Sequence, residues 1–125
     1  MSRAQKASLG LLAVGFIGAG VMHFIRPRMF TQIVPPQLPA PQTLVAVSGA
    51  AEVLGGVGLL IPRLRKAAGW GLVALLAAVF PANIYMATVA ERFASLAPAW
   101  VLWARLPLQP LAMLWVWWAA VRGDR

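Results

Sequence analysis

Cysteine is absent from the sequence, and acidic residues and histidine are scarce: three Asp or Glu and one His occur in 125 residues. The absence of cysteine excludes disulfide bonds, thiolate metal sites and dithiol redox chemistry carried by this chain. One histidine, few carboxylates and scattered methionines do not form a ligand set with a recognisable spacing, so no metal site is predicted. No nucleotide-binding glycine motif and no internal repeat is present in the sequence.

Charge is also scarce. Charged residues make up 11% of the chain, whereas hydrophobic residues make up 61% and the mean hydropathy is +0.76. A soluble domain of this length could not bury so much apolar surface. The natural solvent for such a chain is a lipid bilayer, which a helix of roughly 20 apolar residues can span. The sequence therefore predicts a single transmembrane domain over residues 1–125, with the lipid bilayer as its surroundings.

Four apolar stretches stand out, at about residues 7–25, 42–61, 67–90 and 106–121. Proline-rich or charged segments separate them, so the pattern predicts an all-α fold, a polytopic membrane bundle of four helices. The fourth stretch is short, and we expect Pro107 and Pro110 to lie in its first turn, where a missing N–H is tolerated. The segment from Arg26 to Pro41 is expected to form a helical turn or two around residues 29–33, followed by an extended proline-rich cap.

Basic residues are distributed unevenly between the two sides of this predicted bundle. One side, which carries both termini, has Arg3, Lys6, Arg63, Arg65, Lys66, Arg122 and Arg125. The other side has Arg26, Arg28, Arg92 and Arg105. The positive-inside rule therefore predicts a multi-pass protein of the bacterial cytoplasmic (inner) membrane, with its N and C termini in the cytoplasm. Because this distribution accounts for the net charge of +8, no nucleic-acid partner is predicted. The basic and apolar start is interpreted as a retained signal-anchor.

A single glutamate, Glu52, stands in the middle of the second stretch, within "VSGAAEVLGG". Its position about ten residues into the helix places it near the bilayer midplane, where a charge costs on the order of 3 kcal/mol. The small residues three or four positions away are Ser48, Gly49, Gly55 and Gly56. Such a face lets another helix approach closely. We therefore expect the carboxyl group to point into the bundle.

The other stretches also carry polar groups in the same half of the membrane, namely His23, Asn83, Arg105 and Gln109. Arg105 and Gln109 are four residues apart and share a helix face. Together with Glu52 they are predicted to line an outward-opening polar pocket that binds a ligand, with His23 at its mouth. We expect Glu52 to reach Arg105 through Asn83, Gln109 or water rather than by a direct ion pair.

Each of these residues also has a structural interpretation. His23 fits a hydrated residue at the membrane interface. Asn83 fits a partner for a backbone carbonyl that Pro81, two positions earlier, leaves free. Arg105 fits a flanking residue whose head group extends to the interface. No catalytic role is assigned to any of them.

Several segments resemble the DoxX-like family of small bacterial membrane proteins: "HFIRPRMFTQIVPPQLPAP", "SGAAEVLGGVGLLIPRLRKAAGWGL", "FPANIYMA" and "RLPLQPLAMLWVWWA". The resemblance extends over about residues 15–119 and implies a four-helix membrane fold. It also implies a link to membrane redox metabolism and a redox protein partner, because the family is named for a subunit associated with thiosulfate:quinone oxidoreductase. The five pocket residues coincide with positions typical of its motifs. The resemblance supplies no catalytic mechanism.

Three functions fit these features. The first is an accessory or binding protein that holds a small amphipathic ligand, with a quinone as the candidate, because quinone carbonyls need hydrogen-bond donors in an apolar site. The second is a membrane-embedded enzyme in which Glu52 or His23 carries a proton. The third is a small transporter subunit, which would require a homo-oligomer because four short helices rarely enclose a pore. No cofactor motif is evident.

Overall fold

The computed structural model describes residues 1–94 and 97–122. Helices make up 83% of these residues and no strand occurs among them, which confirms the predicted all-α class. The elements in chain order are α1 (Arg3–Ile25), α2 (Pro27–Thr31), α3 (Pro41–Leu60), α4 (Arg65–Thr88), the 3-10 turn η1 (Ala90–Phe93), α5 (Ala99–Val116) and the π-helical segment η2 (Trp117–Arg122).

Three helices in the described part of the chain, α1, α3 and α4, are long and apolar enough to cross a membrane. Their outer faces carry large exposed apolar side chains: Leu11 is 65% exposed, Val14 74% and Leu54 72%. Such exposure is unfavourable in water and favourable in lipid. The structure therefore supports the prediction of a membrane protein.

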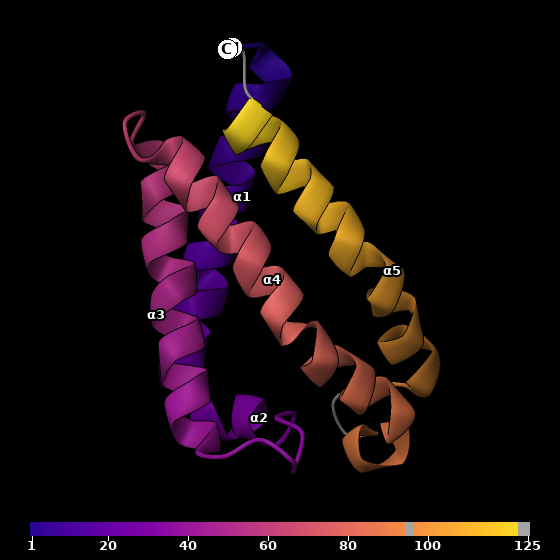
Figure 1. Cartoon of the computed structure of the whole chain (residues 1–125). Coiled ribbons are helices and arrows are strands. Elements are labelled where there is room, and N and C mark those ends of the chain that lie inside the picture. Colours follow the sequence, from indigo (N-terminus) through magenta and orange to yellow (C-terminus); the bar gives the residue numbers. More distant parts are fainter. Residues whose placement is uncertain (95–96, 123–125) are drawn as a thin grey trace.

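Helices α1 and α3 lie side by side, whereas α5 returns alongside α4 to the end of the molecule at which α1 begins (Figure 1). Two hydrogen bonds join the first turns of α1 to the last turns of the chain. Gln5 Nε2 donates to the Trp118 carbonyl at 3.3 Å, and Trp115 Nε1 donates to Ser8 Oγ at 2.9 Å. The start of α1 and the end of the described chain therefore lie on the same side of the molecule.

Two apolar clusters hold the helices together, one at each end. The cluster at the end that carries the termini contains Leu9, Leu12, Leu59, Leu72, Val116, Ala119 and Ala120. The cluster at the opposite end contains Met86, Ala87, Phe93 and Leu102.

Helix α5 differs from the sequence prediction. It begins at Ala99, after Pro98, so Pro107 and Pro110 lie inside the helix. The expectation that both prolines occupy a first turn is therefore wrong. The sequence predicts a connection between the third and fourth apolar stretches, but residues 99–105 of it belong to α5. As a consequence, Arg105 lies in the second turn of α5 rather than at its start.

The connection between α1 and α3 contains the predicted helical turn, which begins two residues earlier than expected, at Pro27. The proline-rich part that follows is not extended. Leu38 N–H donates to the Pro35 carbonyl at 3.0 Å and closes a turn. Proline is favoured at the second position of such a turn, where Pro36 lies, because its φ is already fixed there.

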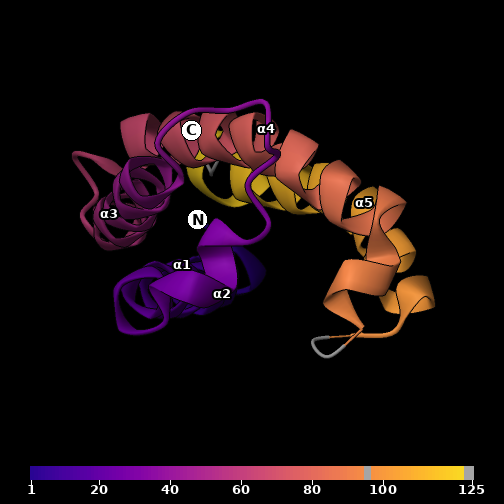
Figure 2. The same ribbon diagram turned by 90° about the horizontal axis from the view of Figure 1, so that it is seen from below.

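Ile33, just after α2, packs against the apolar cluster at the ends of α4 and α5. The connection therefore starts at α1, touches the α4–α5 half of the molecule and returns to α3. Figure 2 shows α2 and this connection from below, between the two halves.

Candidate functional site

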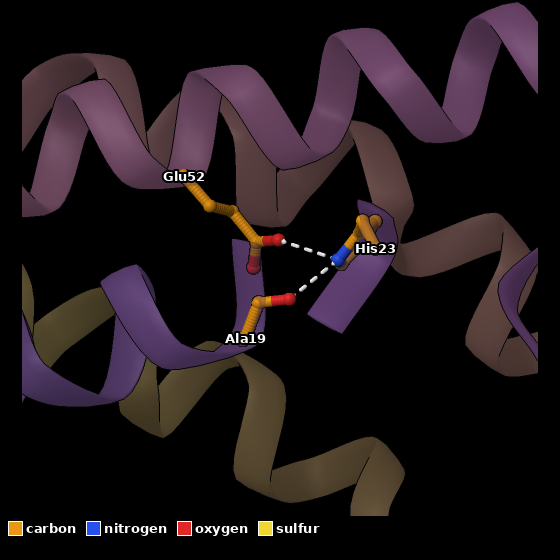
Figure 3. Close-up of polar contacts among 3 residues, drawn as sticks. All are labelled: Ala19, His23 and Glu52. Atoms are coloured by element: carbon orange, nitrogen blue, oxygen red, sulfur yellow. Dashed lines mark hydrogen bonds and ion pairs between the residues drawn. The ribbon is translucent and has the colours of Figure 1, made fainter. Parts of the chain in front are cut away.

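The last turn of α1 and the middle of α3 bring His23 and Glu52 together (Figure 3). His23 Nδ1 lies 3.3 Å from Glu52 Oε2, and the two side chains are only 11% and 14% exposed. The carboxyl group points toward α1 rather than away from the protein. This arrangement agrees with the expectation that the carboxyl group of Glu52 points into the bundle.

Glycines on both helices make the approach possible. A Cβ atom on Gly49 would lie 2.7 Å from His23 Cβ, and a Cβ atom on Gly20 would lie 2.6 Å from the Gly49 carbonyl oxygen. Neither distance is compatible with a real side chain. The small-residue face that surrounds Glu52 in the sequence therefore positions His23 beside the carboxyl group.

The hydrogen bond of His23 fixes its tautomer. Nδ1 lies 2.6 Å from the Ala19 carbonyl oxygen, and a carbonyl oxygen can only accept a hydrogen bond. Nδ1 therefore carries a proton and donates it to Ala19, one turn earlier on α1. Because that proton is used, the 3.3 Å approach of Glu52 Oε2 is an electrostatic contact rather than a second hydrogen bond.

Glu52 Oε2 is consequently a buried oxygen with no hydrogen-bond partner among the residues that the structure describes. Buried polar atoms are normally paired, and leaving one unpaired costs about 1–3 kcal/mol. An orphaned acceptor of this kind can take a hydrogen bond from a hydroxyl or N–H group of a ligand.

Helix α2 covers the histidine. The Phe30 ring stacks on the His23 ring with a centroid distance of 3.9 Å and an angle of 19° between the planes. Stacking of this geometry shields one face of the imidazole from its surroundings. The sequence placed Phe30 in the segment that caps the site but did not connect it with His23, because only the turn at Arg26 brings the two rings together.

Asn83 and Gln109 form a second polar pair, between α4 and α5. Asn83 Nδ2 donates to Gln109 Oε1 at 2.8 Å, and Gln109 Nε2 donates to the Leu76 carbonyl at 2.9 Å. Leu76 lies in the turn before Pro81, which interrupts the backbone hydrogen bonding of α4. Pro81 leaves the carbonyl of Ala77, four residues earlier, without its N–H donor, so the Leu76 carbonyl is not the one that the proline frees. Asn83 donates to Gln109 instead.

Arg105, the fifth predicted pocket residue, lies apart from both pairs. Its side chain is exposed, and Nη1 lies 3.8 Å from Met86 Sδ. Within residues 1–94 and 97–122, no hydrogen bond or ion pair links Glu52 to Arg105, Asn83 or Gln109. The structure thus shows two pairs and a separate arginine, and a single pocket lined by all five residues stays a prediction.

Two surface grooves lie near these elements. One, of about 480 Å³, is lined by residues of the α1–α2 junction: Ile25, Arg26, Pro27, Arg28, Met29 and Gln32. The other, of about 530 Å³, lies between α4 and the last turns of the chain and is lined by Trp70, Val73, Pro110, Met113, Leu114 and Trp117. The first groove begins two residues after His23 in the chain, and neither His23 nor Glu52 is among its lining residues. Among the described residues, no group of three His, Cys, Asp or Glu side chains could hold a metal ion.

Residues 12–120 match a family described as a domain of unknown function (DUF8561), and the chain belongs to this family. No curated protein and no solved structure matches the chain. The match covers all five predicted pocket residues as well as Phe30. It assigns no activity to them, so a function has to be derived from the geometry of the site.

Proposed function

We propose that this family member is an accessory membrane protein that binds a small amphipathic ligand, with the polar group of the ligand hydrogen-bonded to Glu52. The observation that carries the proposal is the buried, unpartnered Oε2 of Glu52 beside His23. A ligand that donates one hydrogen bond would remove the free-energy cost of this oxygen, which is about 1–3 kcal/mol. The ligand also has to be apolar enough to reach a helix that lies in lipid.

A quinone-class ligand fits these requirements best in its reduced form. A quinol has hydroxyl groups that donate hydrogen bonds, whereas the oxidised quinone has carbonyl oxygens that only accept them. Because Nδ1 of His23 already donates to Ala19, it cannot also donate to a quinone carbonyl. We therefore expect the quinol to bind more tightly than the quinone. This preference sharpens the function expected from the DoxX-like resemblance, in which a redox protein partner would produce or consume the quinol.

Helix α2 and the groove at the α1–α2 junction provide the route for such a ligand. Phe30 covers His23, and Met29, the residue before Phe30 on α2, lines the groove. Movement of this five-residue helix would expose the imidazole and the carboxyl group together. An aromatic ligand ring could then stack in the place of Phe30.

The arrangement in the membrane is part of the proposal. We infer a four-helix bundle in the inner membrane, with α5 as the fourth span and both termini in the cytoplasm. An even number of crossings agrees with the hydrogen bonds that join the first turns of α1 to the last turns of the chain. The larger number of basic residues at that end favours the cytoplasm.

Proton transfer is the second candidate function, because two groups that bind and release protons lie in direct contact. In this alternative the Glu52 carboxylate takes the proton of the ligand hydroxyl, and the nearby imidazole stabilises the resulting charges. A transporter subunit, the third possibility from the sequence, has no specific contact in its favour.

The binding proposal is tested with Glu52→Gln. The amide nearly keeps the volume of the side chain but removes the charge of the carboxylate, so a ligand hydroxyl loses the stronger, charge-assisted hydrogen bond. Glu91→Gln is the matched control, because Glu91 is an exposed glutamate in η1, the turn that follows α4.

The measurement is the dissociation constant of a short-chain hydroquinone and of its oxidised quinone, by titration of the purified protein in detergent. We expect the hydroquinone to bind at least tenfold more tightly than the quinone. We expect Glu52→Gln to weaken binding of the hydroquinone about tenfold. Glu91→Gln should change neither value. Equal binding of the hydroquinone to the unmodified protein and to Glu52→Gln would refute the role of Glu52.

A further inference from the structure

The groove between α4 and the end of the chain lies at the opposite end of the molecule from the His23–Glu52 pair. It has a volume of about 530 Å³, and apolar side chains line it on both walls. Gly69 of α4 packs against η2 here, since a Cβ atom on it would lie 2.8 Å from Ala120 Cβ. Two tryptophans, Trp70 at 51% exposure and Trp117 at 37%, flank the groove. Tryptophan in such a position is typical of the membrane–water interface.

A cation lies about one helical turn from each tryptophan, on the side of the molecule that carries the termini. Lys66 precedes Trp70 by four residues of α4 and therefore lies on the same face of that helix. Arg122 follows Trp117 by five residues, and in the π-helical segment η2 residues five positions apart are stacked on each other. Both cations are exposed. The regular α-helical repeat would have rotated Arg122 away from Trp117.

Among the described residues, these two cations have no counter-charge. Neither Lys66 nor Arg122 has a hydrogen bond or an ion pair within residues 1–94 and 97–122. In contrast, the neighbouring Arg65 donates to the Leu59 carbonyl at 2.8 Å. The acidic residues in the described part of the chain, Glu52 and Glu91, lie in the middle of α3 and at the far end of α4.

We propose that this groove binds an anionic phospholipid, with an acyl chain against the apolar walls and the phosphate between Lys66 and Arg122. Charge complementarity selects this occupant, because an apolar groove that ends at two unpaired cations matches an acyl chain that ends at an anionic head group. Basic sites between transmembrane helices bind anionic lipids by this combination of contacts. A zwitterionic lipid would occupy the same apolar walls but would gain less from the two cations.

The test compares two double variants that each remove one lysine and one arginine from the same end of the molecule. Lys66→Gln with Arg122→Gln removes the cations beside the groove. Lys6→Gln with Arg63→Gln removes two exposed cations, neither of which lies one helical turn from a residue that lines the groove. Purified protein is incubated with phosphatidylglycerol or phosphatidylcholine at a fixed mole ratio, and the lipid-bound fraction is measured by native mass spectrometry.

We expect the groove variant to lower the binding constant for phosphatidylglycerol on the order of tenfold, since each cation near a head group contributes a several-fold factor. Binding of phosphatidylcholine should change less than twofold, and the control variant should retain the preference for phosphatidylglycerol. If both double variants lose phosphatidylglycerol equally, the attraction is a property of the whole basic end and the proposal is wrong.

Trp70→Ala tests the apolar part of the groove, and its high exposure makes it compatible with folding. This variant should lower the bound fraction of both lipids by a similar factor, while the helix content measured by circular dichroism stays unchanged. If Trp70→Ala leaves lipid binding intact and instead changes the monomer–dimer ratio, the groove is a contact between two copies of the chain, and the lipid proposal is overturned.

Discussion

Two of the polar pairs that join helices involve the predicted pocket residues, one between α1 and α3 and the other between α4 and α5. In the second pair, Asn83 donates to Gln109 and Gln109 donates to the Leu76 carbonyl, so the amide groups satisfy each other and the backbone. In the first pair, His23 donates to Ala19, and Glu52 Oε2 has no hydrogen-bond partner in the described part of the chain. Both pairs sit in helices surrounded by apolar side chains, yet only one of them is complete.

The difference indicates different roles. A satisfied amide pair crosslinks two helices and costs little to bury, which is sufficient to explain why it is there. The Glu52 Oε2 atom contacts His23 electrostatically but has no hydrogen-bond partner among the described residues, which costs about 1–3 kcal/mol. A protein gains from such an atom only through something that binds to it or exchanges a proton with it. This contrast is the reason why we place the ligand at Glu52 rather than at Asn83.

The largest expected effect comes from a change that separates α1 from α3. In Gly49→Ala, the new Cβ atom would lie 2.7 Å from His23 Cβ and 2.9 Å from the Gly20 carbonyl oxygen, so one helix has to move. Overpacking of this kind costs about 1–3 kcal/mol. We expect Gly49→Ala to lower the unfolding free energy by about 2 kcal/mol and to abolish binding of the hydroquinone.

Gly18→Ala on α1 is the control for this prediction. A Cβ atom on Gly18 would have no neighbour within 4 Å. Alanine is favoured over glycine inside a helix by roughly 0.5–1 kcal/mol, so this variant should be as stable as the unmodified protein or more so. The measurement is thermal or denaturant unfolding in detergent, followed by circular dichroism. Equal stability of the two variants would contradict the close packing of α1 and α3 at Gly49.

The comparison between the two pairs is tested most directly by substituting one residue of each pair with leucine. Asn83→Leu removes the donor to Gln109 Oε1 and should lower the unfolding free energy by about 1 kcal/mol without affecting the hydroquinone. Glu52→Leu removes an oxygen that has no hydrogen-bond partner, so stability should stay the same or rise while hydroquinone binding is lost. If Glu52→Leu destabilised the protein more than Asn83→Leu, the carboxyl group would be a structural element and the assignment of roles would be reversed.

The sequence predicted the first three long helices closely. The apolar stretches at residues 7–25, 42–61 and 67–90 correspond to α1 (Arg3–Ile25), α3 (Pro41–Leu60) and α4 (Arg65–Thr88). A long apolar run specifies a helix because its backbone groups cannot remain unpaired in lipid. The bounds of α5 could not be obtained in this way, because Arg105 interrupts the run without interrupting the helix.

The polar residues of the site were also visible in the sequence, since each is conspicuous in an apolar stretch. Their pairing was not. Whether Glu52 meets His23 or Asn83 depends on the rotation of each helix about its axis and on how the helices cross, and neither is specified by hydropathy. The glycines at positions 20 and 49 are the sequence feature that favours α1 as the neighbour of Glu52, because they allow the closest approach of two backbones.

Substitution of Arg105 has the smallest expected effect on stability and binding. It distinguishes two separate polar pairs from a single pocket that all five residues line. Among the described residues, the polar contact of the Arg105 head group is with Met86 Sδ at 3.8 Å, and the side chain is exposed. Because this exposed guanidinium group forms few interactions that a substitution would remove, Arg105→Gln should change the unfolding free energy by less than about 0.5 kcal/mol. It should also leave hydroquinone binding within twofold of the unmodified protein, as measured by the same titration. If Arg105→Gln instead weakened binding as strongly as Glu52→Gln, all five polar residues would act on one ligand. The α4–α5 half of the molecule would then have to close on α1 and α3 when that ligand binds.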